Sequence, residues 1–359
     1  MPANLRSIAN RMIFHVILAS LSSGQPLVAQ AGEGTDPLLE QARGLFQALP
    51  VDMSTPELPV TPVRVTLGRR LFFDPRLSAD GTVSCATCHR PALYATDALP
   101  RGIGVGHQVN VRHVPTILNA ALQFKAHWLG DRESVEDQAT KSLTGKLSFG
   151  NPDNETVVKK LKSLGYAEEF EEAFPGEQEP IKPENWGKAI GAYERTLVTP
   201  APFDAYLKGD TAALSAEAKA GLKTFISVGC TGCHSGVLLG GQSFQKFGLF
   251  GDYGKEAKSN PVDEGRFTVT GKAEDKYVFK VPLLRNVAMT PPYFHDGSVA
   301  TLPEAVRIMA KLQLGKDLSA AEVRGIVAFL DSLTGPLPED YATEPVLTPM
   351  AFGPAGPGL

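Results

Sequence analysis

The sequence has little cysteine, with four residues in 359, and no long run of one charge sign. Its net charge is −4 at pH 7, which is too small to favour nucleic acid or another strongly charged partner. It also lacks a hydrophobic stretch that could cross a bilayer, since the apolar residues 12–21 are too few and include His15. We therefore expect neither a nucleic-acid-binding protein nor a membrane-spanning one.

All four cysteines belong to two copies of one motif, Cys-x-x-Cys-His. The two copies consist of Cys85, Cys88 and His89, and of Cys230, Cys233 and His234. This is the attachment pattern of a c-type haem, because two thiols reach the two vinyl groups of one porphyrin and the adjacent histidine binds its iron. Thioredoxin-like or zinc-binding Cys-x-x-Cys pairs are the alternative, which the two adjacent histidines disfavour. We predict two covalently bound haem c groups.

The two motifs divide the chain into blocks of domain size, since their first cysteines are 145 positions apart (230 − 85). We predict an N-terminal haem c domain over residues 32–200, a C-terminal one over 201–340 and a Pro-rich tail over 341–359. Helical patterns far outnumber strand patterns. The predicted fold class is therefore mainly α, with two cytochrome c-like haem domains in tandem and a short β-hairpin in the second.

Residues 1–31 have the pattern of an export signal. Arg6 and Arg11 form its basic region, residues 12–21 its apolar region, and residues 29–31 an A-x-A-like cleavage site. Since haem c is attached outside the cytoplasmic membrane, this signal and the haem motifs support each other. The predicted location is the bacterial periplasm.

Capping residues and apolar periodicity predict the individual helices. The expected helical segments are residues 36–49, 63–73, 115–124, 133–143, 154–165, 184–199, 215–230, 303–315 and 319–335. Two segments, 266–270 and 277–281, alternate apolar with polar residues and are expected to pair as the hairpin.

Each iron has one histidine from its motif, and the sixth ligand decides whether the iron transfers electrons or binds substrate. A methionine there would raise the potential of the second iron and make it an electron store. The candidates by residue type are His107, His113, His127, His295, Met53, Met289, Met309 and Met350. From residue type alone, each of these is more often a packing residue than a ligand.

Seven further segments resemble the bacterial dihaem cytochrome c peroxidases, in the same order along the chain. They are residues 67–78, 115–119, 196–200, 203–209, 284–287, 292–297 and 326–330. The resemblance extends from about residue 60 to residue 335 and so covers most of the chain after the signal.

The resemblance implies roles for single residues. Met309 lies 14 positions after His295 (309 − 295), where the family has the methionine ligand of its second haem. Trp128 matches a tryptophan between the haems and is the implied electron relay. Gln138 matches a glutamine in the distal pocket of the first haem, and His107 lies in the loop that carries a displaceable histidine ligand. His295 matches a position near the second haem, where we expect a structural hydrogen bond.

The chain departs from the family at two places. The family has a glutamate ten positions after the distal glutamine, where this chain has Ser148, a poor acid or base at neutral pH. Three alternatives follow: His107 or water moves the proton, the local alignment with the family slips, or peroxide turnover is weak. The family also binds calcium, and Thr290 and Pro292 match its carbonyl ligands. The asparagine ligand is replaced by His113, for which the nearby Asn110 is the expected substitute.

The implied function is a periplasmic dihaem peroxidase that reduces hydrogen peroxide to water. A small cytochrome c or copper protein (a cupredoxin) would deliver electrons to the second haem, and the resemblance also implies a homodimer. One alternative is a dihaem oxidase that modifies Trp or Tyr of a partner protein, like the methylamine-utilisation maturation enzyme. Those enzymes have a tyrosine where Met309 stands. The other alternative is a pure electron-transfer cytochrome, which the match at Gln138 disfavours.

Overall fold

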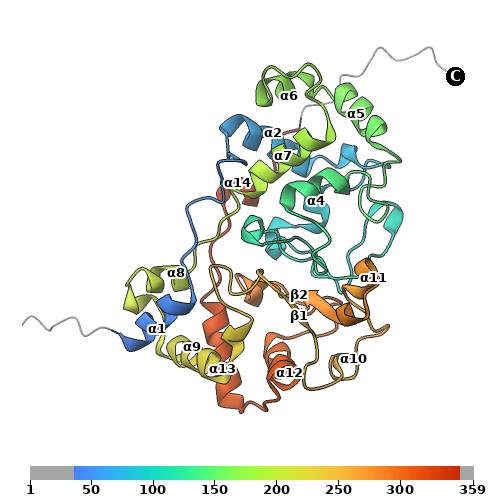
Figure 1. Ribbon diagram of the computed structural model, residues 1–359. Helices are drawn as coiled ribbons and strands as arrows, with labels where there is room; N and C mark the ends of the chain where they lie inside the picture. Colours follow the sequence, from blue (N-terminus) through green and yellow to red (C-terminus); the bar gives the residue numbers. More distant parts are fainter. Residues whose placement is uncertain (1–35, 348–359) are drawn as a thin grey trace, which may run out of the picture. The chain divides into compact units, whose positions relative to one another are not determined.

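The computed structural model describes residues 36–347 (Figure 1). The predicted export signal and Met350 lie outside this range. Within it the chain is mainly helical, with one two-stranded antiparallel sheet. No helix in the described range is long and apolar enough to cross a membrane.

The α-helices are α1 (Pro37–Leu45), α2 (Pro62–Phe73), α3 (Cys85–Cys88), α4 (Val135–Ser142), α5 (Asn154–Ser163), α6 (Ala167–Ala173), α7 (Pro183–Glu194), α8 (Pro202–Leu207), α9 (Ala216–Val228), α10 (Tyr253–Glu256), α11 (Phe267–Thr270), α12 (Leu302–Leu314), α13 (Ala320–Asp331) and α14 (Glu339–Ala342). The 3₁₀ turns are η1 (Pro75–Leu77), η2 (Pro91–Leu93), η3 (Val105–His107), η4 (Ala120–Leu122), η5 (Thr211–Ala213), η6 (Cys230–Gly232), η7 (Ala273–Asp275) and η8 (Val287–Met289). The strands are β1 (Phe244–Lys246) and β2 (Val278–Lys280).

Local capping explains where several helices begin and end. The Ser215 hydroxyl accepts a hydrogen bond from the Ala218 amide and starts α9. Ser319 and Glu322 form a capping box at α13, and Gly315 ends α12 in the left-handed conformation. These predicted boundaries are confirmed. The predicted cap of α5 was one residue late, because the Asp153 side chain, not that of Asn154, accepts from Thr156.

The helix expected over residues 115–124 was wrong, since only the short turn η4 forms there. The preceding residue, Asn119, is left-handed (φ 62°) and cannot continue a helix. Its buried amide donates to the Thr199 hydroxyl at 2.8 Å, and its side-chain oxygen accepts from the Thr199 amide at 3.0 Å. A contact across 80 positions therefore overrides the local helical pattern.

The predicted hairpin was right about one strand and wrong about its partner. Strand β2 forms, but it pairs antiparallel with β1, with Phe244 opposite Lys280. The expected partner forms the one-turn helix α11. The Thr268 hydroxyl there donates to the Gly265 carbonyl, and the Thr270 hydroxyl donates to the Asp275 carboxylate at 2.6 Å, so both side chains bond locally and not across a strand pair.

Buried apolar side chains form two large clusters. The first includes residues of α2, α4 and α7, and the second includes residues of α1, α8, α9 and α13. Glycines allow the central helix pairs to approach closely. A Cβ at Gly68 of α2 would lie 1.8 Å from the Ala189 carbonyl of α7, and one at Gly221 of α9 would lie 1.7 Å from the Gly325 carbonyl of α13. Figure 1 shows α9 and α13 side by side.

Each end of the described chain packs in the cluster formed mainly by the other half of the sequence. Helix α1, at the start, packs in the second cluster. Tyr341 of α14, from the segment predicted as a tail, is fully buried in the first cluster. Neither cluster is therefore one continuous stretch of sequence.

Candidate haem sites

The second Cys-x-x-Cys-His motif directly follows helix α9. Gly229 ends this helix with a φ of 106°, and the chain continues directly into the turn η6. Cys230, Cys233 and His234 lie in and just after this turn. The His234 ring donates from Nδ1 to the Leu239 carbonyl at 2.9 Å. This bond fixes the ring and leaves Nε2 free to bind a metal.

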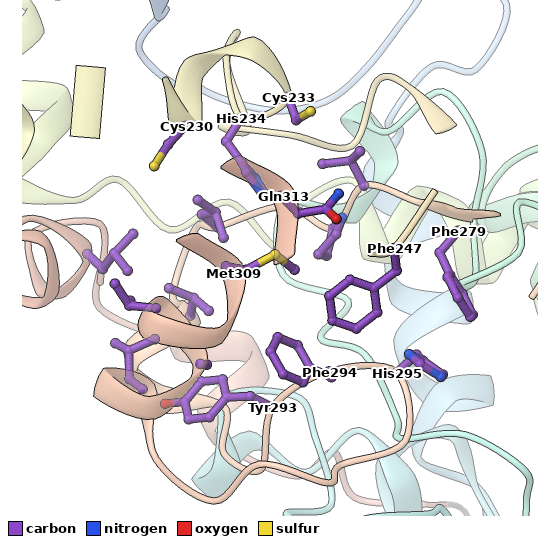
Figure 2. Close-up of a pocket in the computed structure, with 18 of the residues that line it drawn as sticks. Cys230, Cys233, His234, Phe247, Phe279, Tyr293, Phe294, His295, Met309 and Gln313 are labelled. Carbon is purple, nitrogen blue, oxygen red and sulfur yellow. The ribbon is translucent and has the colours of Figure 1, made fainter. Parts of the chain in front are cut away.

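The motif lines a cavity of about 240 Å³, which we call the second cavity because it lies at the second motif. Met309 of α12 lies in its wall. Figure 2 shows the Met309 sulfur and the His234 ring directed into this space. Phe225, Phe247 and many aliphatic side chains form most of the remaining wall. The structure thus brings together four residues that the sequence singled out and that are up to 79 positions apart (309 − 230).

The other candidate ligands for the second iron are placed differently. His113 and His295 also line this cavity, but Met53 and Met289 do not. Met53 is buried in a separate small apolar cluster, and Met289 is largely exposed. His127 lies 3.2 Å from the Asp131 carboxylate. Among the methionines described, only Met309 therefore faces the motif.

The first motif has the same local design. Residues 85–88 form the single turn α3, in which the Thr87 hydroxyl accepts from the Ser84 amide at 2.9 Å. The His89 ring donates from Nδ1 to the Ala95 carbonyl at 3.0 Å. Burial lowers the pKa of both His89 and His234, which keeps these rings neutral as metal ligation requires.

The four cysteines fit covalent haem attachment. All four are free thiols and half-buried, so no disulfide competes for them. Burial raises the pKa of Cys88 and of Cys230 to about 11, and that of Cys85 further. Both metal-binding histidine nitrogens and both thiol pairs are therefore available to a haem.

Trp128 belongs to the wall of the cavity at the second motif. Its ring lines the second cavity and lies edge-on to His295 with a centroid separation of 6.3 Å. The Ala95 carbonyl accepts the hydrogen bond from the His89 ring, and the next residue, Thr96, lines the same cavity as Trp128. The predicted relay residue therefore sits in the wall of the second site.

Gln138 lies on α4, which packs against α7 in the first cluster. Its side chain is half-buried, and no hydrogen bond to it is found among the described residues.

Glu194, the last residue of α7, is buried, and burial raises the pKa of its carboxyl to about 8. Its charge is close enough to Cys85 to raise the pKa of that thiol, although burial is the larger cause.

His107 is exposed on a loop that reaches the first motif. The loop is closed by an antiparallel bridge between Ile103 and Val109, and the Ile103 carbonyl lies 3.6 Å from the Cys88 sulfur. A Cβ at Gly104 would lie 2.0 Å from the Leu147 carbonyl, so the loop packs tightly against the segment before Ser148.

The Ser148 hydroxyl forms hydrogen bonds with backbone carbonyls. It donates to the carbonyls of Ser142 at 2.8 Å and Gly145 at 3.1 Å. The Ser148 carbonyl accepts from the Val105 amide at 2.9 Å. Ser148 therefore holds a turn and supports the His107 loop.

The residues predicted for calcium offer few oxygens. Thr290 and Pro292 line the cavity wall, but the His113 ring donates to the Leu99 carbonyl at 2.7 Å, and the Asn110 amide donates to the Leu147 carbonyl. Between residues 36 and 347 there is no group of three or more His, Cys, Asp or Glu side chains suited to a metal. The Asn110 bond uses only its amide nitrogen, so the calcium prediction still depends on the backbone carbonyls of Thr290 and Pro292 and on the side-chain oxygen of Asn110.

His295 is buried with 3% of its surface exposed and stacks on Phe279 with ring centroids 4.2 Å apart. Its carbonyl accepts from the His113 amide. Its Nε2 has no hydrogen-bond partner in the described part of the chain. The expected structural hydrogen bond is therefore made by the backbone of His295 and not by its ring nitrogen Nε2.

Sequence reasoning missed two residues that contact these sites. The hydroxyl of Tyr341 donates to the His89 carbonyl at 2.6 Å. Lys280 of β2 lines the second cavity, and burial lowers the pKa of its ammonium to about 8. The alternation at residues 277–281 does put Lys280 on one face of a strand, but the sequence does not say which face is buried.

Known proteins resemble this chain over nearly its whole length. Residues 62–212 match the family model described as di-haem cytochrome c peroxidase. Cytochrome c551 peroxidase of Pseudomonas aeruginosa is 42% identical over 342 residues, which cover 93% of this chain and 96% of that protein. Methylamine utilization protein MauG of Methylorubrum extorquens is 38% identical over 289 residues, covering 77% and 79% of the two chains.

A solved structure shows the same fold. The crystal structure of a MauG-like protein associated with microbial copper homeostasis is 29% identical and superposes with a TM-score of 0.71. The match covers 83% of this chain and 96% of that one. The resemblance inferred from the sequence is confirmed.

Proposed function

Since this chain belongs to the di-haem cytochrome c peroxidase family and is an oxidoreductase of the peroxidase type, we propose that it reduces hydrogen peroxide to water in the periplasm, with electrons from a small cytochrome c or copper protein. The observation that carries this proposal is Met309 in one cavity with Cys230, Cys233 and His234. If Met309 and His234 both held the iron of a haem there, that haem would suit electron storage and not substrate binding.

The chain's own residues would hold one haem at each motif, through Cys85, Cys88 and His89, and through Cys230, Cys233 and His234. A haem supplies one-electron chemistry at its iron when bound. The carbonyls of Ala95 and Leu239 orient the two rings through Nδ1 and increase the basicity of each free nitrogen. In this proposal the first site takes peroxide and the second takes electrons from the donor protein.

At the first site, Gln138 and His107 would handle the substrate. Reduction of one peroxide consumes two electrons and two protons and gives two waters. The side-chain amide of Gln138 has no hydrogen-bond partner among residues 36–347 and could hydrogen-bond a bound peroxide. Because the Ser148 hydroxyl is bound to two carbonyls, the exposed His107 or water would deliver the protons.

Trp128 would carry electrons between the sites. Its ring nitrogen is hydrogen-bonded and its ring contacts the second cavity, so the side chain is held in one orientation. An ordered aromatic ring between two redox groups shortens each electron-transfer step.

Peroxide-dependent oxidation of a reduced small cytochrome c by the holoprotein tests this proposal. Turnover that is lost in Gln138→Leu but retained in the surface variant Lys246→Met supports it. A holoprotein with both haems that consumes peroxide without oxidising the cytochrome contradicts it.

A second candidate is an oxidase that modifies Trp or Tyr of a partner protein. It is favoured by Ser148, which replaces the family glutamate, and by the 38% identity to methylamine utilization protein MauG. The methionine in the second cavity opposes it. Peroxide-dependent crosslinking or oxidation of a partner, with no cytochrome oxidation, would favour this candidate.

A further inference from the structure

We propose that Lys280 is the cation that binds a propionate carboxylate of the haem in the second site, and that it thereby positions this haem and raises its reduction potential. The inference deepens the proposed second haem site and rests on it. It assigns a role to a residue that lies outside both Cys-x-x-Cys-His motifs.

The backbone of Lys280 is fixed by two contacts. It is the last residue of β2 and pairs with Phe244 of β1. Its amide donates to the Trp128 carbonyl at 2.7 Å. The side chain is 5% exposed and lines the same cavity as His234 and Met309. Its position relative to the predicted haem is therefore set by the sheet and by Trp128.

The ammonium of Lys280 has no counter-ion in the described part of the chain. Its Nζ donates to the Gln123 side-chain oxygen, which is uncharged. No carboxylate of residues 36–347 forms an ion pair with it. An ammonium has three hydrogens to donate, and burying its charge unpaired is costly. Lys280 therefore has both the charge and the hydrogen-bonding capacity to take a carboxylate from a ligand.

Lys280 stands alone among the described lining residues in its charge. Of the side chains between residues 36 and 347 that line the cavity, it is the only lysine or arginine. Arg266 lies near the sheet, over the Phe244 ring at 4.1 Å, but it donates to the Leu129 carbonyl and does not line the cavity. A haem carries two propionates, and the largely apolar wall gives them little else to bind. The charges of Lys280 and a propionate are complementary.

The same contact predicts an electrochemical effect. Ferric haem carries one more positive charge than ferrous haem, so a nearby ammonium disfavours the ferric state and raises the reduction potential. This acts in the same direction as a methionine ligand. Lys280 would thus help the second haem to hold an electron.

The test compares purified holoproteins carrying Lys280→Met, Lys280→Arg and Lys246→Met. Lys246 is a matched control, because it lies on β1 of the same sheet, is exposed and does not line the cavity. The measurements are haem content, the midpoint potential of the second haem in a spectroelectrochemical titration, and the propionate bending vibration in resonance Raman spectra. None of them depends on peroxidase activity.

We expect Lys280→Met to lower the equilibrium constant for reduction of the second haem at least about tenfold, or about 59 mV for one electron, and to shift the propionate vibration. Lys280→Arg and Lys246→Met should retain both properties. Loss of the second haem in Lys280→Met alone also supports the inference.

Gln123→Leu separates haem binding from a purely structural role. This variant removes the amide partner and leaves the ammonium, so the potential should stay close to that of the unmodified protein. Equal shifts in Gln123→Leu and Lys280→Met would overturn the inference, as would an unchanged potential and vibration in fully loaded Lys280→Met. A protein that binds no haem at Cys230 and Cys233 would instead overturn the proposed second site itself.

Discussion

The indole Nε1 of Trp128 donates a hydrogen bond to the backbone carbonyl of His113 at 2.9 Å. The His113 amide donates in turn to the His295 carbonyl, and the Trp128 carbonyl accepts from the Lys280 amide, both at 2.7 Å. These bonds join the segment after the first haem motif to the wall of the second cavity. The tryptophan is thus held at both its ring and its backbone.

Trp128→Phe tests the relay. We expect the rate of peroxide-dependent cytochrome oxidation to fall on the order of tenfold, equivalent to about 1.4 kcal/mol of barrier, because an electron must pass without the indole. Loss of the hydrogen bond should lower the free energy of unfolding by about 1 kcal/mol. Stopped-flow measurement of electron transfer between the haems is the direct readout.

Trp186→Phe is the matched control for this experiment. The Trp186 ring nitrogen also donates to a backbone carbonyl, that of Thr140, but the residue does not line the second cavity. This variant should lose stability and keep the transfer rate. Equal rates in both variants would exclude a relay through Trp128.

Ser148→Ala tests whether the serine has any catalytic part. Because its hydroxyl donates to the carbonyls of Ser142 and Gly145, we expect a loss of about 1 kcal/mol in stability. The rate of peroxide reduction, measured by stopped-flow spectroscopy, should stay within about twofold of that of the unmodified protein. A fall of about 10²-fold or more, the usual effect of removing a general acid or base, would show that Ser148 moves the proton.

Met309→Leu tests the sixth ligand of the second haem. The two side chains have similar volume, so the free energy of unfolding should change by less than about 1.5 kcal/mol. The potential of the second haem should fall and its low-spin spectrum should be lost, because leucine cannot bind iron. The exposed Met289 provides the control variant Met289→Leu. Unchanged spectra in both variants would make Met309 a packing residue.

Asp74→Asn tests an ion pair that holds the segment before the first motif. The Asp74 carboxylate is buried, accepts from Tyr166 at 2.7 Å and pairs with Arg76 at 2.6 Å. Burial alone would raise the pKa of Asp74, but these hydrogen bonds outweigh it, so the pKa lies below its ordinary value of 3.8. At neutral pH the variant should lose about 2 kcal/mol of stability.

The pH dependence follows from the direction of that shift. A carboxyl whose pKa is lower in the folded state stabilises the protein above pH 3.8, and this contribution is lost as the pH falls through the lower folded value. Denaturant titrations should therefore show the difference between the protein and Asp74→Asn shrinking below pH 3.8. Asp153→Asn, at an exposed helix cap, should be nearly neutral. A constant difference at all pH values would contradict the ionic role.

The features that the sequence could predict depend either on a few neighbouring residues or on the resemblance to a known family. The haem motifs depend on five adjacent residues each, and the caps at Ser215, Ser319 and Gly315 on the few residues around them. Assigning Met309 to the same site as His234 required the family pattern, because no local signal separates it from a core methionine.

Features that depend on distant contacts were missed or wrong. Asn119 ends the helical pattern of residues 115–124 only because Thr199 binds its amide. Strand β2 found its partner more than 30 residues upstream, which alternation alone cannot identify. The burial of Lys280 and Tyr341 likewise depends on how separate segments pack.

Oxidation of a reduced small cytochrome c by hydrogen peroxide tests the proposed peroxidase activity most directly. The holoprotein would first be reduced by one electron and supplied with calcium. We expect rapid turnover that needs both haems and continues in Ser148→Ala. A haem spectrum that responds to peroxide while the cytochrome stays reduced would contradict it.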